Sequence, residues 1–92
     1  MYARLVQGNT KPDQVLELNR IFLERVLPIL RQEAGFVDAM GLVSDTDRDQ
    51  SIGISLWKSK EDHDKYVATQ APKILESVRH LLQGEPIAYV QC

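Results

Sequence analysis

Four polar side chains fall on the apolar faces of the predicted helical regions. His63, Tyr66 and Gln70 follow the i, i+3, i+7 spacing that places residues on one side of a helix, and Val67 marks that side as inward. Asn19 likewise lies among apolar residues of the first helical region. Taken alone, each is more simply explained by a local structural hydrogen bond. As a group converging between helices and sheet, they predict a small-molecule pocket.

Two residues of the predicted strands could complete such a pocket. Trp57 ends the third strand, and an indole often lies where a core meets a cavity, although filling the core is its more common role. Arg4 lies within an apolar strand, where it could bind an anionic ligand or pair with Asp38 across the sheet. We expect the pair, and we keep Arg4 and Trp57, with Asn19 and Gln70, as candidate substrate-binding residues.

Other motifs for catalysis or metal binding are incomplete. The two histidines lack metal-ligand spacing and have no suitable Cys or acidic cluster beside them. Residues 45–49 resemble the start of a calcium loop, but Gln50 and Leu56 stand where that loop needs Gly and Glu. Cys92 is the only cysteine, so it cannot form an internal disulfide. We therefore expect no metal and no cofactor.

Length and charge limit the kind of protein this is. The chain has 92 residues and a net charge of -2, which predicts a single domain over residues 1–92. Its Lys and Arg residues are scattered among acids, which argues against nucleic-acid binding. Neither a membrane-spanning run nor a secretory signal is recognisable. With a single cysteine, these features predict a cytoplasmic location.

Two similar series of elements fill the chain. Strands are expected at residues 1–7, 36–43, 52–57 and 87–91. Helices are expected at residues 12–33, 60–68 and 72–82. Thr10 with Asp13, and Ser59 with Asp62, have the spacing of a capping box and should begin the two helical regions. Pro28 should kink or interrupt the first helix because it supplies no N–H.

This order of elements strongly limits the fold. A β-α-β-β-α-β series predicts an α+β, ferredoxin-like domain with an antiparallel sheet and helices on one face. Residues 36–43 and 52–57 are apolar or small on both faces, whereas a sheet with one solvated face should alternate. We therefore expect a homodimer through the open sheet face. A monomer with a modestly apolar open face is the alternative.

Three stretches together resemble the antibiotic biosynthesis monooxygenase family over nearly the whole chain. They are residues 35–39 (Gly-Phe-Val-Asp-Ala), residues 56–62 (Leu-Trp-Lys-Ser-Lys-Glu-Asp) and the helix break at Ala71-Pro72. The resemblance implies a dimeric α+β barrel, in which two ferredoxin-like subunits pack sheet to sheet. The family includes cofactor-independent oxygenases of polycyclic aromatic phenols, quinol oxygenases and haem-degrading enzymes.

The haem-degrading branch uses an Asn, a Trp and a His at its site. Here Leu5, Tyr66 and Glu76 hold or lie near those positions, so haem degradation is disfavoured. The resemblance then implies a cofactor-independent monooxygenase acting on a quinol or other small aromatic molecule. Such an enzyme must deprotonate an electron-rich phenol and let the anion meet dioxygen in a dry pocket.

The candidate residues can be given roles in that reaction. His63 could be the general base because its ordinary pKa suits the task. Tyr66, Asn19 and Gln70 could orient the substrate oxygens, with Trp57 packing on the ring. Two other functions stay open: a non-catalytic small-molecule-binding or regulatory dimer, and an isomerase or lyase that uses no oxygen. Fold alone does not choose among them.

Overall fold

The computed structural model describes residues 1–47 and 49–91. Its strands are β1 (Tyr2–Asn9), β2 (Phe36–Val43), β3 (Gln50–Trp57) and β4 (Ile87–Gln91). Its α-helices are α1 (Val15–Ile21), α2 (Leu27–Arg31), α3 (Lys60–Thr69) and α4 (Ala71–Val78), with a π-helix at Phe22–Val26 and a 3₁₀ turn at Arg79–Leu81. The predicted order of elements is confirmed. Cys92 lies outside the described residues.

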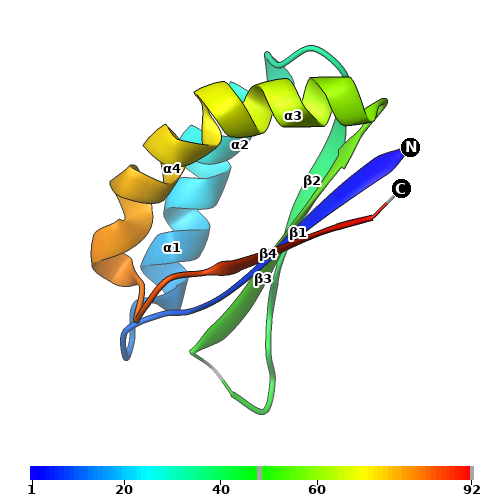
Figure 1. The fold of residues 1–92 in the computed structure, drawn as a ribbon. Helices are drawn as coiled ribbons and strands as arrows, with labels where there is room; N and C mark the ends of the chain where they lie inside the picture. Colours follow the sequence, from blue (N-terminus) through cyan, green and yellow to red (C-terminus); the bar gives the residue numbers. More distant parts are fainter. Residues whose placement is uncertain (48, 92) are drawn as a thin grey trace.

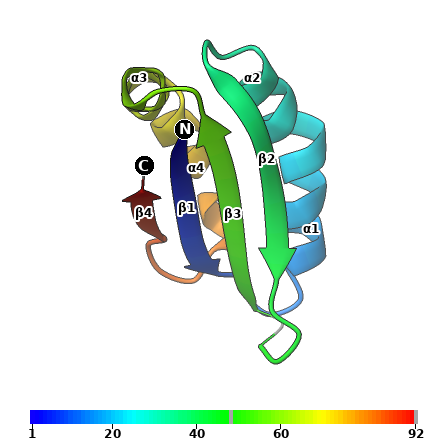
Figure 2. The same cartoon turned by 90° about the vertical axis from the view of Figure 1, so that its right-hand side faces the viewer.

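The four strands form one antiparallel sheet in the order β2-β3-β1-β4. All helices lie on the same side of it, as seen from the edge in Figure 1 and from the open face in Figure 2. We call these two sides the covered face and the open face. This is the predicted α+β, ferredoxin-like architecture. No helix within residues 1–47 and 49–91 is long and apolar enough to cross a membrane.

The two predicted capping boxes have different outcomes. Ser59 caps α3 as predicted, because its Oγ accepts a bond from the Asp62 N–H at 3.2 Å and donates to Asp62 Oδ2 at 3.0 Å. The capping box predicted at Thr10 is wrong, because α1 begins only at Val15 and has no side-chain cap. Thr10 is fully buried instead, and its hydroxyl donates to the Asp49 carbonyl oxygen at 3.2 Å.

The first helical region is interrupted near Pro28, as predicted. The Leu27 N–H donates to the Phe22 carbonyl, which is the five-residue spacing of a π-helix, and Pro28 lies in the first turn of α2. A proline ring clashes with the carbonyl four residues before it, so a wider turn at that point relieves the contact. Such π turns often occur at functional sites.

Gly35 makes the tight connection from α2 to β2. Its φ of 78° is in the left-handed region that favours glycine. A Cβ placed there would clash with the side chain of Asp62, whose Oδ2 accepts the hydrogen bond from Ser59. Glycine therefore lets this connection approach the first turn of α3, which lies over one end of the sheet.

Candidate functional site

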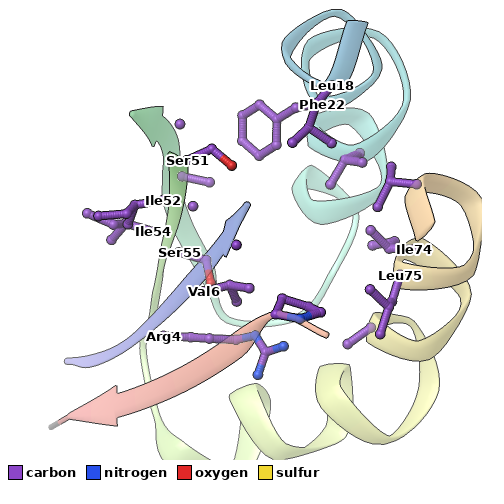
Figure 3. Close-up of a pocket in the computed structure, with 18 of the residues that line it drawn as sticks. Arg4, Val6, Leu18, Phe22, Ser51, Ile52, Ile54, Ser55, Ile74 and Leu75 are labelled. Atoms are coloured by element: carbon purple, nitrogen blue, oxygen red, sulfur yellow. The ribbon is translucent and has the colours of Figure 1, made fainter. Parts of the chain in front are cut away.

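A cavity of about 460 Å³ lies between the covered face of the sheet and the helices. Apolar side chains from separate elements form its walls (Figure 3), including Val6 of β1, Leu18 of α1, Phe22 of the π-helix and Ile74 of α4. A largely apolar hollow with few polar groups is typical of a small-molecule site. The sequence predicted such a pocket in this place.

The space exists because the covered face of β3 carries small residues. Ser51, Gly53 and Ser55 alternate with Ile52 and Ile54, whose side chains point away from the helices in Figure 3. Neighbouring strand residues point to opposite faces, so Ile52 and Ile54 project to the open face. The sequence analysis did not select these small residues, although their alternation over residues 51–55 was visible.

Arg4 is a cation in this otherwise apolar cavity. It lines the wall, and its guanidinium extends between the sheet and the helices in Figure 3. Among the ion pairs formed by the described residues, none involves Arg4. An unpaired guanidinium beside apolar walls suits an anionic ligand group.

The predicted pair between Arg4 and Asp38 is wrong. Arg4 lies opposite Ser55, whereas a bulge in β2 places Asp38 opposite Leu56. Because Ser55 and Leu56 are successive residues of one strand, Arg4 and Asp38 are on opposite faces of the sheet. Asp38 Oδ1 instead accepts a bond from the backbone N–H of Ala39, at 2.8 Å.

Tyr66 of α3 joins the cavity to the packed core. It lines the cavity, is 7% exposed, and its ring stacks on Trp57 with centroids 4.8 Å apart. Burial raises the pKa of the Tyr66 hydroxyl; the Arg4 charge partly opposes this, and Glu33 adds to it. The phenol is therefore neutral at neutral pH and can donate a hydrogen bond into the cavity.

Trp57 belongs to the core behind Tyr66. Its side chain is fully buried, its indole N–H donates to Ser55 Oγ at 3.0 Å, and Phe36 packs edge-on against it with ring centroids 5.6 Å apart. Trp57 is not among the described residues that line the cavity. The core role that the sequence analysis weighed for it is therefore the one that its contacts support.

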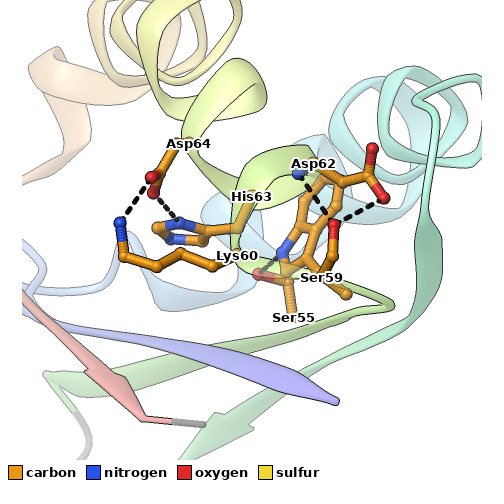
Figure 4. Close-up of polar contacts among 7 residues, drawn as sticks. Ser55, Ser59, Lys60, Asp62, His63 and Asp64 are labelled. Atoms are coloured by element: carbon orange, nitrogen blue, oxygen red, sulfur yellow. Dashed lines mark hydrogen bonds and ion pairs between the residues drawn. The ribbon is translucent and has the colours of Figure 1, made fainter.

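His63 of α3 is buried and is not among the described residues that line the cavity; Figure 4 shows its contacts with Asp64. It is 4% exposed, and its ring centroid lies 4.7 Å from that of Tyr2 and 6.5 Å from that of Trp57. Its Nδ1 donates to Asp64 Oδ1 at 2.9 Å, and Asp64 Oδ2 accepts from Lys60 at 2.7 Å. Its Nε2 is buried without a hydrogen-bond partner among the described residues.

The remaining two candidates occupy the edges of this region. Asn19 lines the cavity as an exposed residue at its rim, near Gly41 of β2. Gln70 lies at the junction of α3 and α4, where its backbone N–H donates to the Tyr66 carbonyl at 2.8 Å. Gln70 is not among the described residues that line the cavity. Of the six candidates, Arg4, Asn19 and Tyr66 thus line one cavity, while His63, Trp57 and Gln70 lie beside it.

The side chains that line the cavity offer hydrogen bonds and one positive charge. In the part of the chain that the structure describes, no three His, Cys, Asp or Glu residues are grouped to hold a metal ion. What the site can do chemically is enclose a flat apolar molecule, attract an anionic oxygen to Arg4, and donate a hydrogen bond from Tyr66.

The family model of the antibiotic biosynthesis monooxygenases matches residues 1–74 of the chain. No curated protein sequence matches it significantly. A monooxygenase from the ActVA-Orf6 gene of Streptomyces coelicolor, solved in complex with nanaomycin D, is similar in structure, with a TM-score of 0.84 and 19% identity over 98% of this chain and 84% of that one.

Two further solved structures share the fold. The cofactor-independent oxygenase SnoaB from Streptomyces nogalater has a TM-score of 0.80 at 15% identity, over 99% of this chain and 91% of its own. A conserved protein from Methanosarcina mazei Go1 has a TM-score of 0.82 at 16% identity, with the same coverage of 99% and 91%. With the family model matching most of its length, the chain belongs to the antibiotic biosynthesis monooxygenase family.

Proposed function

We propose that the protein is a cofactor-independent monooxygenase that oxidises a quinol or another small aromatic phenol in the cavity. The observation that carries this proposal is a largely apolar cavity lined by both the Arg4 cation of β1 and the neutral Tyr66 phenol of α3, with the Arg4 charge acting on the Tyr66 hydroxyl. Family membership supports it, as do the structural relatives, one of which is a cofactor-independent oxygenase and another of which binds nanaomycin D.

In this proposal the cavity stabilises the substrate as its phenolate. The Arg4 guanidinium lowers the pKa of a bound phenol by favouring the charged form, and the Tyr66 hydroxyl donates a hydrogen bond to the same oxygen. The electron-rich anion reacts with dioxygen at a ring carbon. One oxygen atom becomes the new carbonyl oxygen and the other leaves as water. The substrate supplies all four electrons that reduce dioxygen, so a phenol and dioxygen give a quinone and water.

The reaction also needs a group that accepts the phenol proton. His63 stays the predicted general base, since Asp64 holds its Nδ1 and its buried Nε2 is free to accept a proton. His63 is not among the described residues that line the cavity; its ring packs edge-on against Trp57, which in turn stacks on Tyr66. A direct contribution from His63 therefore requires a rearrangement that brings its ring to the cavity. The roles of Trp57 and Gln70 in substrate binding stay predictions, because neither is among the described lining residues.

Oxygen consumption by the purified protein tests the proposal. We expect uptake above autoxidation with a panel of hydroquinones and naphthols, and one labelled oxygen atom in the quinone when ¹⁸O₂ is supplied. Arg4→Gln and Tyr66→Phe should reduce this rate, and His63→Ala should reduce it if His63 is the base. The matched control is His80→Ala, because His80 is exposed and lies outside the cavity lining. No uptake across the panel would contradict the proposal.

One observation favours a non-catalytic binding protein as the second candidate. No Asp, Glu or His is among the described residues that line the cavity, so no ordinary general base touches a ligand there. A binding or regulatory protein needs none. Saturable binding of a phenol without oxygen uptake or any chemical conversion would identify this function, whereas conversion without oxygen uptake would indicate an isomerase or lyase.

We also propose that the protein is a homodimer through the open face. Large apolar side chains are exposed there, including Met40 at 47%, Leu42 at 49%, Ile87 at 56% and Tyr89 at 49%. A contiguous apolar face of this kind marks an interaction surface. Sedimentation should give a dimer for the wild type and a monomer for Ile54→Glu. Leu16→Glu should stay dimeric, because Leu16 is an exposed apolar residue of α1 on the other side of the molecule.

A further inference from the structure

Two glycines face each other across neighbouring strands at the base of the cavity. Gly41 of β2 lies directly opposite Gly53 of β3, and both line the hollow. Val6 of β1 continues the same row on the other side of Gly53. The sheet therefore presents bare backbone at this point, where strands usually carry side chains.

The fold does not need glycine at either position. A Cβ at Gly53 would meet nothing within 4 Å, and one at Gly41 would meet only Asn19 Oδ1 at 3.9 Å. Neither residue has the positive φ found at Gly35 and Gly84. Glycine inside a strand weakens the strand relative to alanine, because the unfolded chain is freer and no side chain packs.

The position of Arg4 indicates what the empty space holds. Arg4, Ser55 and Ala39 form the next row on the same face, two residues along the strands from the glycine row. Two residues of a strand span roughly 7 Å, about the length of two fused six-membered rings. An aromatic anion with its oxygen at Arg4 would therefore extend its second ring over Gly53 and Gly41.

We propose that the Gly41–Gly53 pair determines substrate specificity, by leaving room on the sheet for the ring farthest from the reacting oxygen. This inference rests on the proposed function, in that it takes the cavity as the substrate site. A side chain at either position would occupy the space next to the backbone. The cavity would then still admit a single ring near Arg4 but would exclude a larger flat molecule.

Calorimetric titration with phenol and 2-naphthol tests the inference. We expect Gly53→Val to weaken 2-naphthol binding roughly ten-fold or more, because an added side chain in a filled site forces strain, and to change phenol binding by less than about three-fold. Gly53→Ala and Gly41→Ala should show smaller losses with the same selectivity. The thermal unfolding midpoint of the alanine variants should be unchanged or higher by a few degrees, roughly.

Gly84→Ala is the matched control. Gly84 has a φ of 81° and nothing within 4 Å of its Cβ position, so alanine is strained there without touching the cavity lining. We expect a lower unfolding midpoint with unchanged binding of both ligands. Gly84→Ala should thus lose stability and keep binding, whereas Gly53→Ala should keep its stability and lose affinity for 2-naphthol.

The inference is overturned if Gly53→Val binds both ligands as the wild type does, if it loses both equally, or if wild type binds neither. Failure of Gly53→Ala to fold would also overturn it, since the glycine would then serve the fold. Oxygen uptake is measured separately. An active wild type whose Gly53→Val variant oxidises 2-naphthol equally well would refute the inference alone, and size-selective binding without oxygen uptake would refute the oxygenase alone.

Discussion

The two ends of the covered face show how one sheet surface can be both core and cavity. At one end Trp57 of β3 packs against Phe36 of β2 and lies under Tyr66 and His63 of α3. Two rows away, Gly53 occupies the same strand and the same face. We call these the packed end and the hollow end.

The difference between them is in the strand residues rather than in the backbone. From Ser51 to Trp57 the pairing of β3 with β1 is continuous, yet the residues directed to the helices change from small to the largest side chain available. Large rings remove the space between sheet and helices, and small residues leave it. Stability should therefore depend on the packed end and ligand binding on the hollow end, with Tyr66 and Arg4 at the boundary.

The largest expected effect is the loss of Trp57. Trp57→Ala should lower the free energy of unfolding by about 3–5 kcal/mol, because it removes a fully buried ring and leaves a hole among Tyr66, Phe36 and Ser55. Urea unfolding measures this. Trp57→Phe, which keeps a ring, should lose less. A loss below about 1 kcal/mol would contradict the division into two ends.

Replacement of Arg4 tests the hollow end. Arg4→Gln should weaken phenolate binding roughly ten-fold or more, since it removes the positive charge beside the anion, and should change stability little. The rising limb of the pH–rate profile should move to higher pH, because the bound phenol loses the charge that lowers its pKa. In Arg4→Lys, which keeps the positive charge, the rising limb should stay near its wild-type pH. If the pH–rate profile of Arg4→Gln is not shifted, a group other than Arg4 stabilises the phenolate.

The sequence predicted the fold well because element order and capping signals are local. Ser59 shows this, since its box lies where the chain leaves β3 for a helix. Thr10 carries the same spacing but is held by Asp49, a contact 39 residues away that no local pattern reveals. The π-helix before Pro28 is an intermediate case, in which the interruption was predictable and its form was not.

The site was only partly predictable for a similar reason. Helical spacing placed His63 and Tyr66 correctly on the inward side of α3, and both are buried. Helical spacing could not distinguish the two, because both are inward, yet Tyr66 lines the cavity and His63 packs against Tyr2 and Trp57. The face of Arg4 relative to Asp38 depended on a bulge in β2, which shifts the register by one residue.

A smaller effect is expected at the helix that covers the packed end. Ser59→Ala should cost about 1 kcal/mol of stability, because the Asp62 N–H loses its side-chain acceptor. The comparison is Ser77→Ala in α4, whose exposed hydroxyl donates to the Ile74 carbonyl within its own helix and should contribute almost nothing. Equal losses in chemical denaturation would mean that the cap does not anchor α3.

The smallest expected effect is on the pH dependence of stability and comes from the Tyr66 hydroxyl. The ring of Tyr66 stacks at the packed end, whereas its hydroxyl belongs to the hollow end. Burial raises the hydroxyl pKa above its ordinary value of 10.0, so the folded state holds this proton more tightly than the unfolded state. The stability that the folded state gains from this pKa shift is complete below pH 10.0 and is lost as the pH rises through the folded pKa. Tyr66→Phe keeps the stacked ring without the titrating group. Unfolding midpoints measured across alkaline pH should therefore fall less in Tyr66→Phe than in the wild type, and parallel curves would place the Tyr66 hydroxyl in water rather than at the edge of a dry cavity.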